Sequence, residues 1–115
     1  MEAKFVDKEW GHEIWLANNE KENYCGKILR IKEGYSSSMH FHMEKHETFY
    51  VTDGKLQVIL IDTEQGQERH HMVLEGCTFE IERGQPHKLI AYGGDVEFIE
   101  ISTFHRDSDS KRIKR

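Results

Sequence analysis

Apolar and polar residues alternate along most of this chain, in short runs separated by turn residues. The alternation is clear in the runs 25–32, 47–53 and 96–102. A period of two places successive side chains on opposite faces of a β-strand, whereas an amphipathic helix needs apolar residues three and four positions apart. No stretch of the sequence shows a clear helical stripe. The sequence therefore predicts an all-β fold.

The turn residues divide the chain into short predicted strands. Nine strands are expected, at residues 13–17, 25–32, 37–43, 47–53, 55–62, 70–74, 77–82, 87–92 and 96–102. Asp53 and Gly54 separate two of them and favour a two-residue hairpin, because such a turn needs a positive φ. Short strands at regular spacing are typical of a small β-barrel or a jelly roll.

A chain of 115 residues has room for a single domain with one core. We expect residues 1–24 to supply one or more strands that pack on a barrel formed by residues 25–102. Residues 103–115 read as a charged C-terminal tail. Its last part, Lys111 to Arg115, is expected to be a solvated terminus.

The charge and the cysteines restrict the partners and the compartment. A net charge of −5 argues against nucleic acid or an anionic membrane as a partner, since both need a basic face. No apolar run approaches the length of a membrane-spanning helix. Cys25 and Cys77 follow no metal or redox spacing, so we expect free thiols in a reducing cytoplasm, with a disulfide as the alternative. The alternation around Cys77 predicts a small core residue.

Four residues have the chemistry and spacing of one metal site. His40 and His42 are two positions apart, so on a strand they point to the same side. Glu47 follows after a single bend, and His87 comes forty residues later, just past a Gly-Gln-Pro turn. Three imidazoles and one carboxylate suit a single divalent ion such as Zn, Fe, Mn, Ni or Co. The remaining histidines are expected to lie outside this site: His12, His46, His70, His71 and His105.

The spacing of these ligands resembles the two sequence motifs of the cupins. The first motif matches throughout, in the order Gly34, His40, His42, Glu47 and Gly54. The second begins at Gly76, passes Gly84 and reaches His87, with Glu82 where the family usually has proline and Ala91 where it usually has asparagine. The resemblance implies a single-domain cupin, which is a small jelly-roll-like β-barrel (a double-stranded β-helix), with four ligands pointing inward at one end. It also implies a homodimer.

The parity of the strands predicts what surrounds the ion. Counting in steps of two from Glu47 and from His87 gives an apolar wall, formed by Phe49, Val51, Leu89 and Ala91. Counting back from His40 brings the hydroxyl groups of Ser38 and Ser36 toward the metal. Other side chains fall on the opposite face, against a neighbouring sheet or a second subunit: Met39, Phe41, Met43 and Tyr50.

The N-terminal segment resembles the cupin domain of mannose-6-phosphate isomerases. Lys8 to Glu13 is similar to their Pro-Trp-Gly segment, and Lys27 stands where they often carry a lysine. His40 replaces their usual glutamine and Lys45 their arginine, so the resemblance does not extend to mannose specificity. It implies a metal-dependent isomerase or epimerase that acts on a sugar phosphate or a related polar sugar.

Further residues are candidates for binding and catalysis in such an enzyme. Glu100 and Glu97 have opposite parity on the last strand, so only one can face the cavity, and we favour Glu100 as the base. Lys27 or Lys45 could hold a phosphate, and Trp10 could close the cavity or stack on a sugar. Two alternatives use the same ligands. One is an iron-dependent dioxygenase, and the other is a non-catalytic protein that binds a sugar or another small molecule through its metal.

Overall fold

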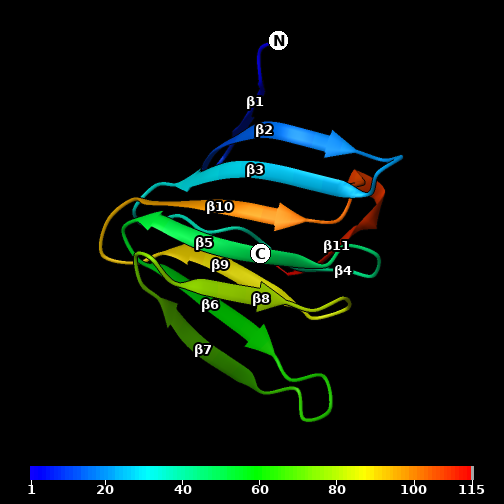
Figure 1. The fold of residues 1–115 in the computed structure, drawn as a ribbon. Helices are drawn as coiled ribbons and strands as arrows, with labels where there is room; N and C mark the ends of the chain where they lie inside the picture. The colour runs from blue at the N-terminus through cyan, green and yellow to red at the C-terminus, as the bar shows by residue number, and fades with distance from the viewer. Residues whose placement is uncertain (115) are drawn as a thin grey trace.

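The computed structural model describes residues 1–114 and shows an all-β fold, as expected (Figure 1). Its strands are β1 (Lys4–Lys8), β2 (Gly11–Asn19), β3 (Tyr24–Ile31), β4 (Met39–His42), β5 (Glu47–Asp53), β6 (Leu56–Ile61), β7 (Glu68–Val73), β8 (Thr78–Ile81), β9 (His87–Ala91), β10 (Val96–Ser102) and β11 (Ser110–Lys114). One 3₁₀ turn, η1 (Asp107–Asp109), precedes β11. No helix within residues 1–114 is long and apolar enough to cross a membrane.

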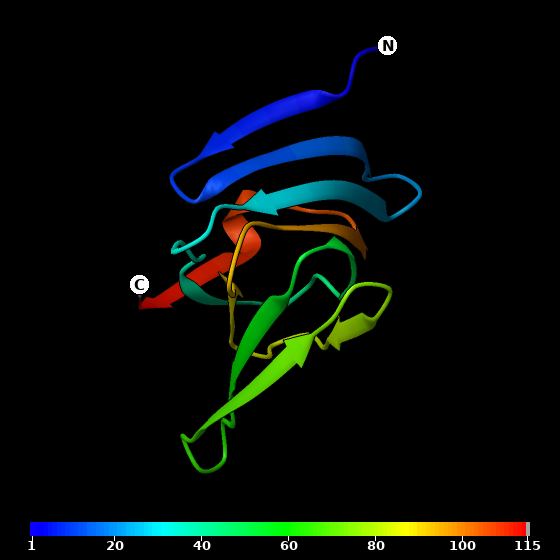
Figure 2. The same ribbon diagram turned by 90° about the vertical axis from the view of Figure 1, so that its left-hand side faces the viewer.

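The strands form two antiparallel sheets. The larger has the order β1-β2-β3-β10-β5-β8, and the smaller has the order β11-β4-β9-β6-β7. The turned view shows the two sheets curving around a shared interior (Figure 2). Side chains on the inner faces alternate with outward ones, so β3, β9 and β10 each bury every second residue. This is the small jelly-roll-like barrel that the alternation predicts.

The hydrophobic core takes residues from both sheets and borders the cavity of the histidines through Phe49 and Leu89. Its largest members include Phe49 and Phe98, whose rings meet edge to face at a centroid distance of 5.2 Å. Val51, Leu89 and Ala91 are also buried in this core, as parity predicts. Core residues therefore form part of the cavity wall.

The turn at Asp53 and Gly54 is not the expected hairpin. Gly54 has the predicted positive φ, at +84°, but β5 and β6 lie in different sheets, so the turn forms a corner of the barrel. A Cβ at Gly54 would come within 2.3 Å of the Asp95 carbonyl oxygen. Glycine is thus required both by conformation and by a close backbone contact.

Two strands at the ends of the chain, β1 and β11, lie outside the nine expected strands, although one or more strands were expected within residues 1–24. β1 pairs with β2, and β11 pairs with β4. The charged C-terminal tail thus contains a strand at Ser110–Lys114, although its residues are exposed, as expected of a solvated terminus; Arg115 lies outside the described residues. In both strands nearly every residue is exposed, so neither could carry an alternating apolar pattern.

The outer face of the larger sheet carries a row of apolar side chains. Strand register places them side by side across neighbouring strands, in the order Phe5, Ile14, Ile28, Ile99 and Tyr50. Tyr50 therefore faces outward, as parity predicts, whereas Met39 is buried. The expected homodimer stays a prediction.

Both cysteines are free thiols, as expected, but Cys77 is exposed and not in the core. It precedes β8, and its backbone N–H donates to the Leu74 carbonyl in a turn. Alternation cannot be extended into a turn, which explains the wrong prediction.

Candidate metal centre

The three histidines of the predicted site meet at one end of the barrel. His40 and His42 lie on β4 and His87 begins β9, and the Cα atoms of His40 and His87 are direct partners across these strands. One ligand atom from each histidine lies within 4.8 Å of the other two. The pleat of β4 and the pairing of β4 with β9 thus bring together residues far apart in the sequence.

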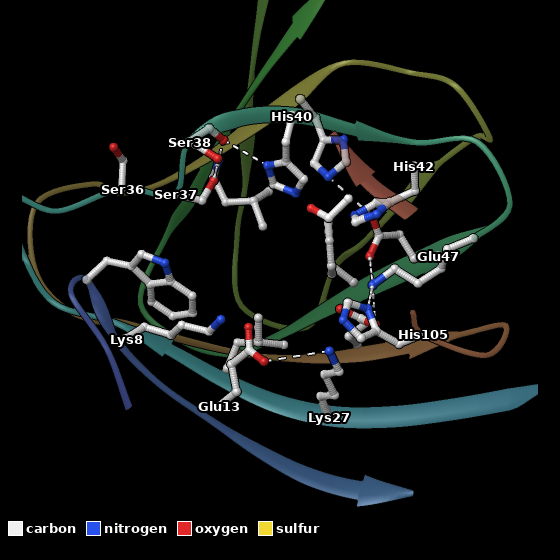
Figure 3. Close-up of a pocket in the computed structure, with 18 of the residues that line it drawn as sticks. Lys8, Glu13, Lys27, Ser36, Ser37, Ser38, His40, His42, Glu47 and His105 are labelled. Atoms are coloured by element: carbon white, nitrogen blue, oxygen red, sulfur yellow. Dashed lines mark hydrogen bonds and ion pairs between the residues drawn. The ribbon is translucent and has the colours of Figure 1, made fainter. Parts of the chain in front are cut away.

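Glu47 borders this cluster, at the start of β5. Its Oε2 atom lies 3.2 Å from His87 Nε2 and 3.7 Å from His42 Nε2. The structure therefore places the carboxylate beside two of the three histidines, at the side of the cluster nearest β5. Figure 3 shows His40, His42 and Glu47 directed toward the same cavity.

Backbone carbonyl groups orient two of the imidazole rings. The Nδ1–H of His40 donates to the Ser38 carbonyl at 2.8 Å, and the Nδ1–H of His87 donates to the Gln85 carbonyl at 2.9 Å. Because a carbonyl can only accept, these bonds place the proton on Nδ1 and leave Nε2 with a free lone pair. A metal-binding histidine is commonly fixed in this way.

Several buried polar atoms of the site have no hydrogen-bond partner within residues 1–114. They are His42 Nδ1, Glu47 Oε2 and His87 Nε2. A buried polar atom without a partner is costly, and a cluster of such atoms needs an explanation. Two of them, His87 Nε2 and Glu47 Oε2, lie 3.2 Å apart, with His42 Nε2 3.7 Å from Glu47 Oε2, and nitrogen and carboxylate donors so placed fit a divalent cation.

The protonation states of His40 and His42 also favour a metal site. Burial, together with the nearby His87, lowers the pKa of His40 to about 4. Burial and the charge of Lys45 lower the pKa of His42 to about 2. Both rings are therefore neutral near pH 7, which is the state that binds a metal.

A buried ion-pair network surrounds the ligand cluster. Lys45 Nζ lies 3.1 Å from Glu100 Oε2 and 3.5 Å from Glu47 Oε1. It also lies 3.0 Å from His105 Nδ1, and Ser102 Oγ donates to Glu100 at 2.8 Å. Burial opposes both charges. Even so, Glu100 and Glu47 raise the pKa of Lys45, and Lys45 and Lys27 lower the pKa of Glu100 to about 2.

A cavity of about 380 Å³ opens onto the cluster. All the predicted site residues line it, namely Trp10, Lys27, Ser38, His40, His42, Lys45, Glu47, His87 and Glu100. Phe49 and Leu89 form its apolar wall. Glu97 faces outward and lies 3.6 Å from Arg30, so the choice of Glu100 by parity agrees with the structure.

The structure adds residues that sequence reasoning missed. Glu13 and His105 both line the cavity, although His105 was expected to lie outside the site. His105 is brought in by Asn18, whose side chain both accepts from its backbone N–H and donates to its carbonyl. This contact spans 87 positions of sequence, so local periodicity could not have revealed it. Glu13 lies on the predicted strand at residues 13–17, but no site residue was identified on that strand from which its parity could be counted.

Asp109 was also missed, and it anchors the C-terminal segment beside the site. Its carboxylate accepts the backbone N–H groups of Met43, Glu44 and Lys45 at 2.9 to 3.2 Å. The side chain is 7% exposed. The turn that carries Lys45 is therefore held by a residue more than sixty positions away.

Comparison with protein families agrees with this geometry. Residues 27–102 match the family model described as the cupin domain. The chain belongs to the cupin domain family. A comparison with curated proteins finds no match to this cupin.

Solved structures share the cupin fold at low sequence identity. Oxalate decarboxylase from Bacillus subtilis superimposes with a TM-score of 0.83 and 20% identity, over 96% of this chain and 30% of that one. The capsular polysaccharide assembling protein CapF from Staphylococcus aureus gives 0.84 and 17%, over 98% of this chain and 34% of that one. This cupin therefore spans about a third of the length of these proteins, and the likeness is one of fold.

Proposed function

We propose that this cupin is a metal-dependent isomerase or epimerase that acts on a sugar phosphate or a related polar sugar. One observation carries the proposal: three histidines that could hold a metal ion, two of them kept neutral by burial, share their cavity with buried lysines and buried carboxylates. The resemblance of Lys8 to Glu13 to mannose-6-phosphate isomerases supports the same class. The substrate is left open, because His40 and Lys45 depart from the pattern of those enzymes.

The residues that would hold the ion are His40, His42, His87 and Glu47. When bound there, a divalent ion supplies Lewis acidity to a carbonyl and its neighbouring hydroxyl group. The remaining chemistry falls to the side chains around the ligands.

Lys45 is suited to stabilise negative charge on a substrate oxygen. Its raised pKa keeps the ammonium group protonated, and Glu100 and Glu47 hold it next to the ligand cluster. A charged donor of this kind forms strong hydrogen bonds to an oxyanion. Ser102 supports the arrangement by donating to Glu100.

The contacts of Glu100 favour a positioning role for this residue. Its pKa is lowered and its Oε2 atom already accepts from Lys45 and Ser102, so it is a weak base in this state. We therefore assign Glu100 to holding Lys45, in place of the catalytic base that its parity first indicated. The base must then come from another residue of the cavity.

His105 has the geometry of a general base. Its Nε2–H donates to Asp107 Oδ1 at 2.8 Å and its Nδ1 accepts from Lys45 Nζ at 3.0 Å, so Nδ1 would take up a proton once Lys45 turns to a substrate oxygen. Burial, together with the charges of Lys45 and Lys27, lowers its pKa and keeps the ring neutral. A carboxylate that fixes the tautomer of a histidine is a recurrent arrangement in general-base catalysis. Removing a proton from a substrate carbon would place positive charge on His105, which Asp107 would stabilise.

The buried charges also fit a reaction that develops one negative charge. Two buried lysines, Lys27 and Lys45, face three buried carboxylates of the same cavity, which are Glu13, Glu47 and Glu100. In their ionised forms these groups leave one negative charge. A divalent ion would change this balance to one positive charge, which an enediolate substrate would neutralise.

The direct test is solvent exchange at the substrate carbon next to the carbonyl. The zinc-loaded protein in D₂O is incubated with aldose and ketose phosphates, and deuterium incorporation is followed by NMR. The proposal predicts exchange that is lost in His105→Asn and retained, at a lower rate, in Glu100→Gln. Absence of exchange with every aldose and ketose phosphate would exclude an isomerase of this kind. Oxygen consumption with the iron-loaded protein would instead favour the dioxygenase.

A further inference from the structure

Lys27 has unused hydrogen-bonding capacity inside the cavity. Its side chain is 2% exposed, and its nearest carboxylate oxygen, Glu13 Oε1, lies 3.6 Å away. The ammonium group forms no hydrogen bond within residues 1–114, although it lies 4.1 Å from the centre of the Trp15 ring. A buried ammonium group has three N–H donors that normally find acceptors. Lys27 therefore offers donors to a molecule in the cavity.

Trp15 holds Lys27 and Glu13 together. Its Nε1–H donates to Glu13 Oε1 at 2.8 Å, while its ring faces the Lys27 ammonium group. Strand pairing fixes this arrangement, because Trp15 on β2 is the direct partner of Lys27 on β3. Trp15 is thus a positioning residue, and Glu13 and Lys27 form a preorganised pair.

The pair lies across the cavity from the metal ligands. Glu13, Lys27 and His40 line the same cavity, and Figure 3 shows Glu13 and Lys27 on the side opposite His40 and His42. A ligand held at the histidines could therefore reach the pair with another of its groups. The pair itself lies outside the set of metal ligands.

The charges of the pair favour a hydroxyl group over an anion. Lys27 already has a countercharge in Glu13, so the pair does not need an anionic ligand for charge balance. A carboxylate beside an ammonium group presents an acceptor next to a donor. A hydroxyl group both donates and accepts, so it matches this arrangement, whereas a phosphate would be repelled by Glu13.

We propose that Glu13 and Lys27 form a hydroxyl-recognition site for a polyhydroxylated ligand whose other end lies at the metal cluster. This inference rests on the proposed function for the class of ligand, and it identifies which side chains read the ligand's hydroxyl groups. It predicts selectivity for ligands with several adjacent hydroxyl groups.

Binding of a substrate analogue that cannot react tests the site apart from catalysis. Sorbitol 6-phosphate has no carbonyl group, so its affinity for the zinc-loaded protein can be measured by calorimetry without turnover. Glu13→Gln and Lys27→Met should each weaken its binding by about tenfold or more, since each removes a charge-assisted hydrogen bond. Neither substitution should change the binding of 1,6-hexanediol monophosphate by much, because this compound has the phosphate but only one hydroxyl group.

Controls separate this site from folding and from the metal. Zinc content should be the same in all variants, and Glu97→Gln, on the outer face of β10, should bind as the wild type does. Trp15→Phe keeps an aromatic ring at this position but removes the indole N–H that donates to Glu13. It should therefore weaken sorbitol 6-phosphate binding even if Lys27→Met fails to fold.

Two results would overturn the proposal. One is a wild-type protein that does not bind sorbitol 6-phosphate. The other is a Glu13→Gln variant that binds inorganic phosphate more tightly and sorbitol 6-phosphate unchanged, because that would make Lys27 an anion site. A lack of carbon-proton exchange would refute the proposed isomerase but would leave these binding results standing.

Discussion

His87 Nε2 and Glu47 Oε2 lie 3.2 Å apart at the buried end of the cavity, and neither atom forms a hydrogen bond within residues 1–114. The distance is short enough for a hydrogen bond, but the His87 proton is on Nδ1, bonded to the Gln85 carbonyl. Two lone-pair donors therefore face each other without a proton between them. A cation bound here would relieve this repulsion, and the neighbouring His42 would add a third donor.

The metal-free protein should lose stability in mild acid. The pKa values of His40 and His42 are about 4 and 2 in the folded state, against 6.5 for an unperturbed histidine. As the pH falls below 6.5, the unfolded chain binds protons that the folded chain does not. Each histidine then lowers the free energy of unfolding by up to about 1.4 kcal/mol per pH unit.

Urea denaturation in the presence of a chelator measures this effect. The free energy of unfolding should be lower at pH 5.0 than at pH 7.5, and the difference should shrink in His40→Gln/His42→Gln. Glu100 does not contribute in this window, because its lowered pKa affects stability only below its ordinary value of 4.5. Equal stability at the two pH values would contradict neutral buried histidines.

Removing Lys45 should destabilise the fold strongly. Lys45→Met leaves the buried carboxylates of Glu47 and Glu100 without their common cation, and breaking a buried ion pair in this way costs about 3 to 5 kcal/mol. Adding Glu100→Gln should recover part of the loss. Urea denaturation of the metal-free variants measures both effects, with the exposed Lys55→Met as a control. Additive losses in the double variant would argue against a coupled network.

Asp109 should tie the C-terminal segment to the barrel. Asp109→Ala removes the acceptor of three backbone N–H groups, so we expect a loss of about 2 to 3 kcal/mol. Hydrogen exchange should become faster at the amides of Met43, Glu44 and Lys45 and along β11. The exposed Asp7→Ala provides the comparison. Unchanged protection of β11 would mean that strand pairing alone holds this segment.

The alternation of side chains along β-strands was the most informative pattern in the sequence. It predicted that Glu100 and not Glu97 faces the cavity, and it placed His40, His42 and Phe49 on inner faces, because buried strands impose a strict alternation. It failed at β1 and β11, whose faces are both largely exposed and therefore lack the pattern. It also failed at Asp53 and Gly54, where a turn between sheets has the same local signal as a hairpin.

The ligands and much of the cavity lining could be predicted, whereas His105 could not. His40, His42, Glu47 and His87 have a diagnostic spacing, because two strands and one turn fix their positions. His105 has no such spacing, since its place depends on contacts with Asn18 and Lys45 from distant parts of the chain. Contacts of this length follow from the closure of the barrel, which single-sequence patterns do not describe.

The metal content of the purified protein tests the central claim most directly. After reconstitution with zinc and removal of excess metal, elemental analysis should find one ion per chain in the wild type. His42→Ala and His87→Ala should lose it, and the exposed His70→Ala should retain it. Full occupancy in both His42→Ala and His87→Ala, or a wild-type chain that holds no zinc, would contradict the assignment of this metal centre.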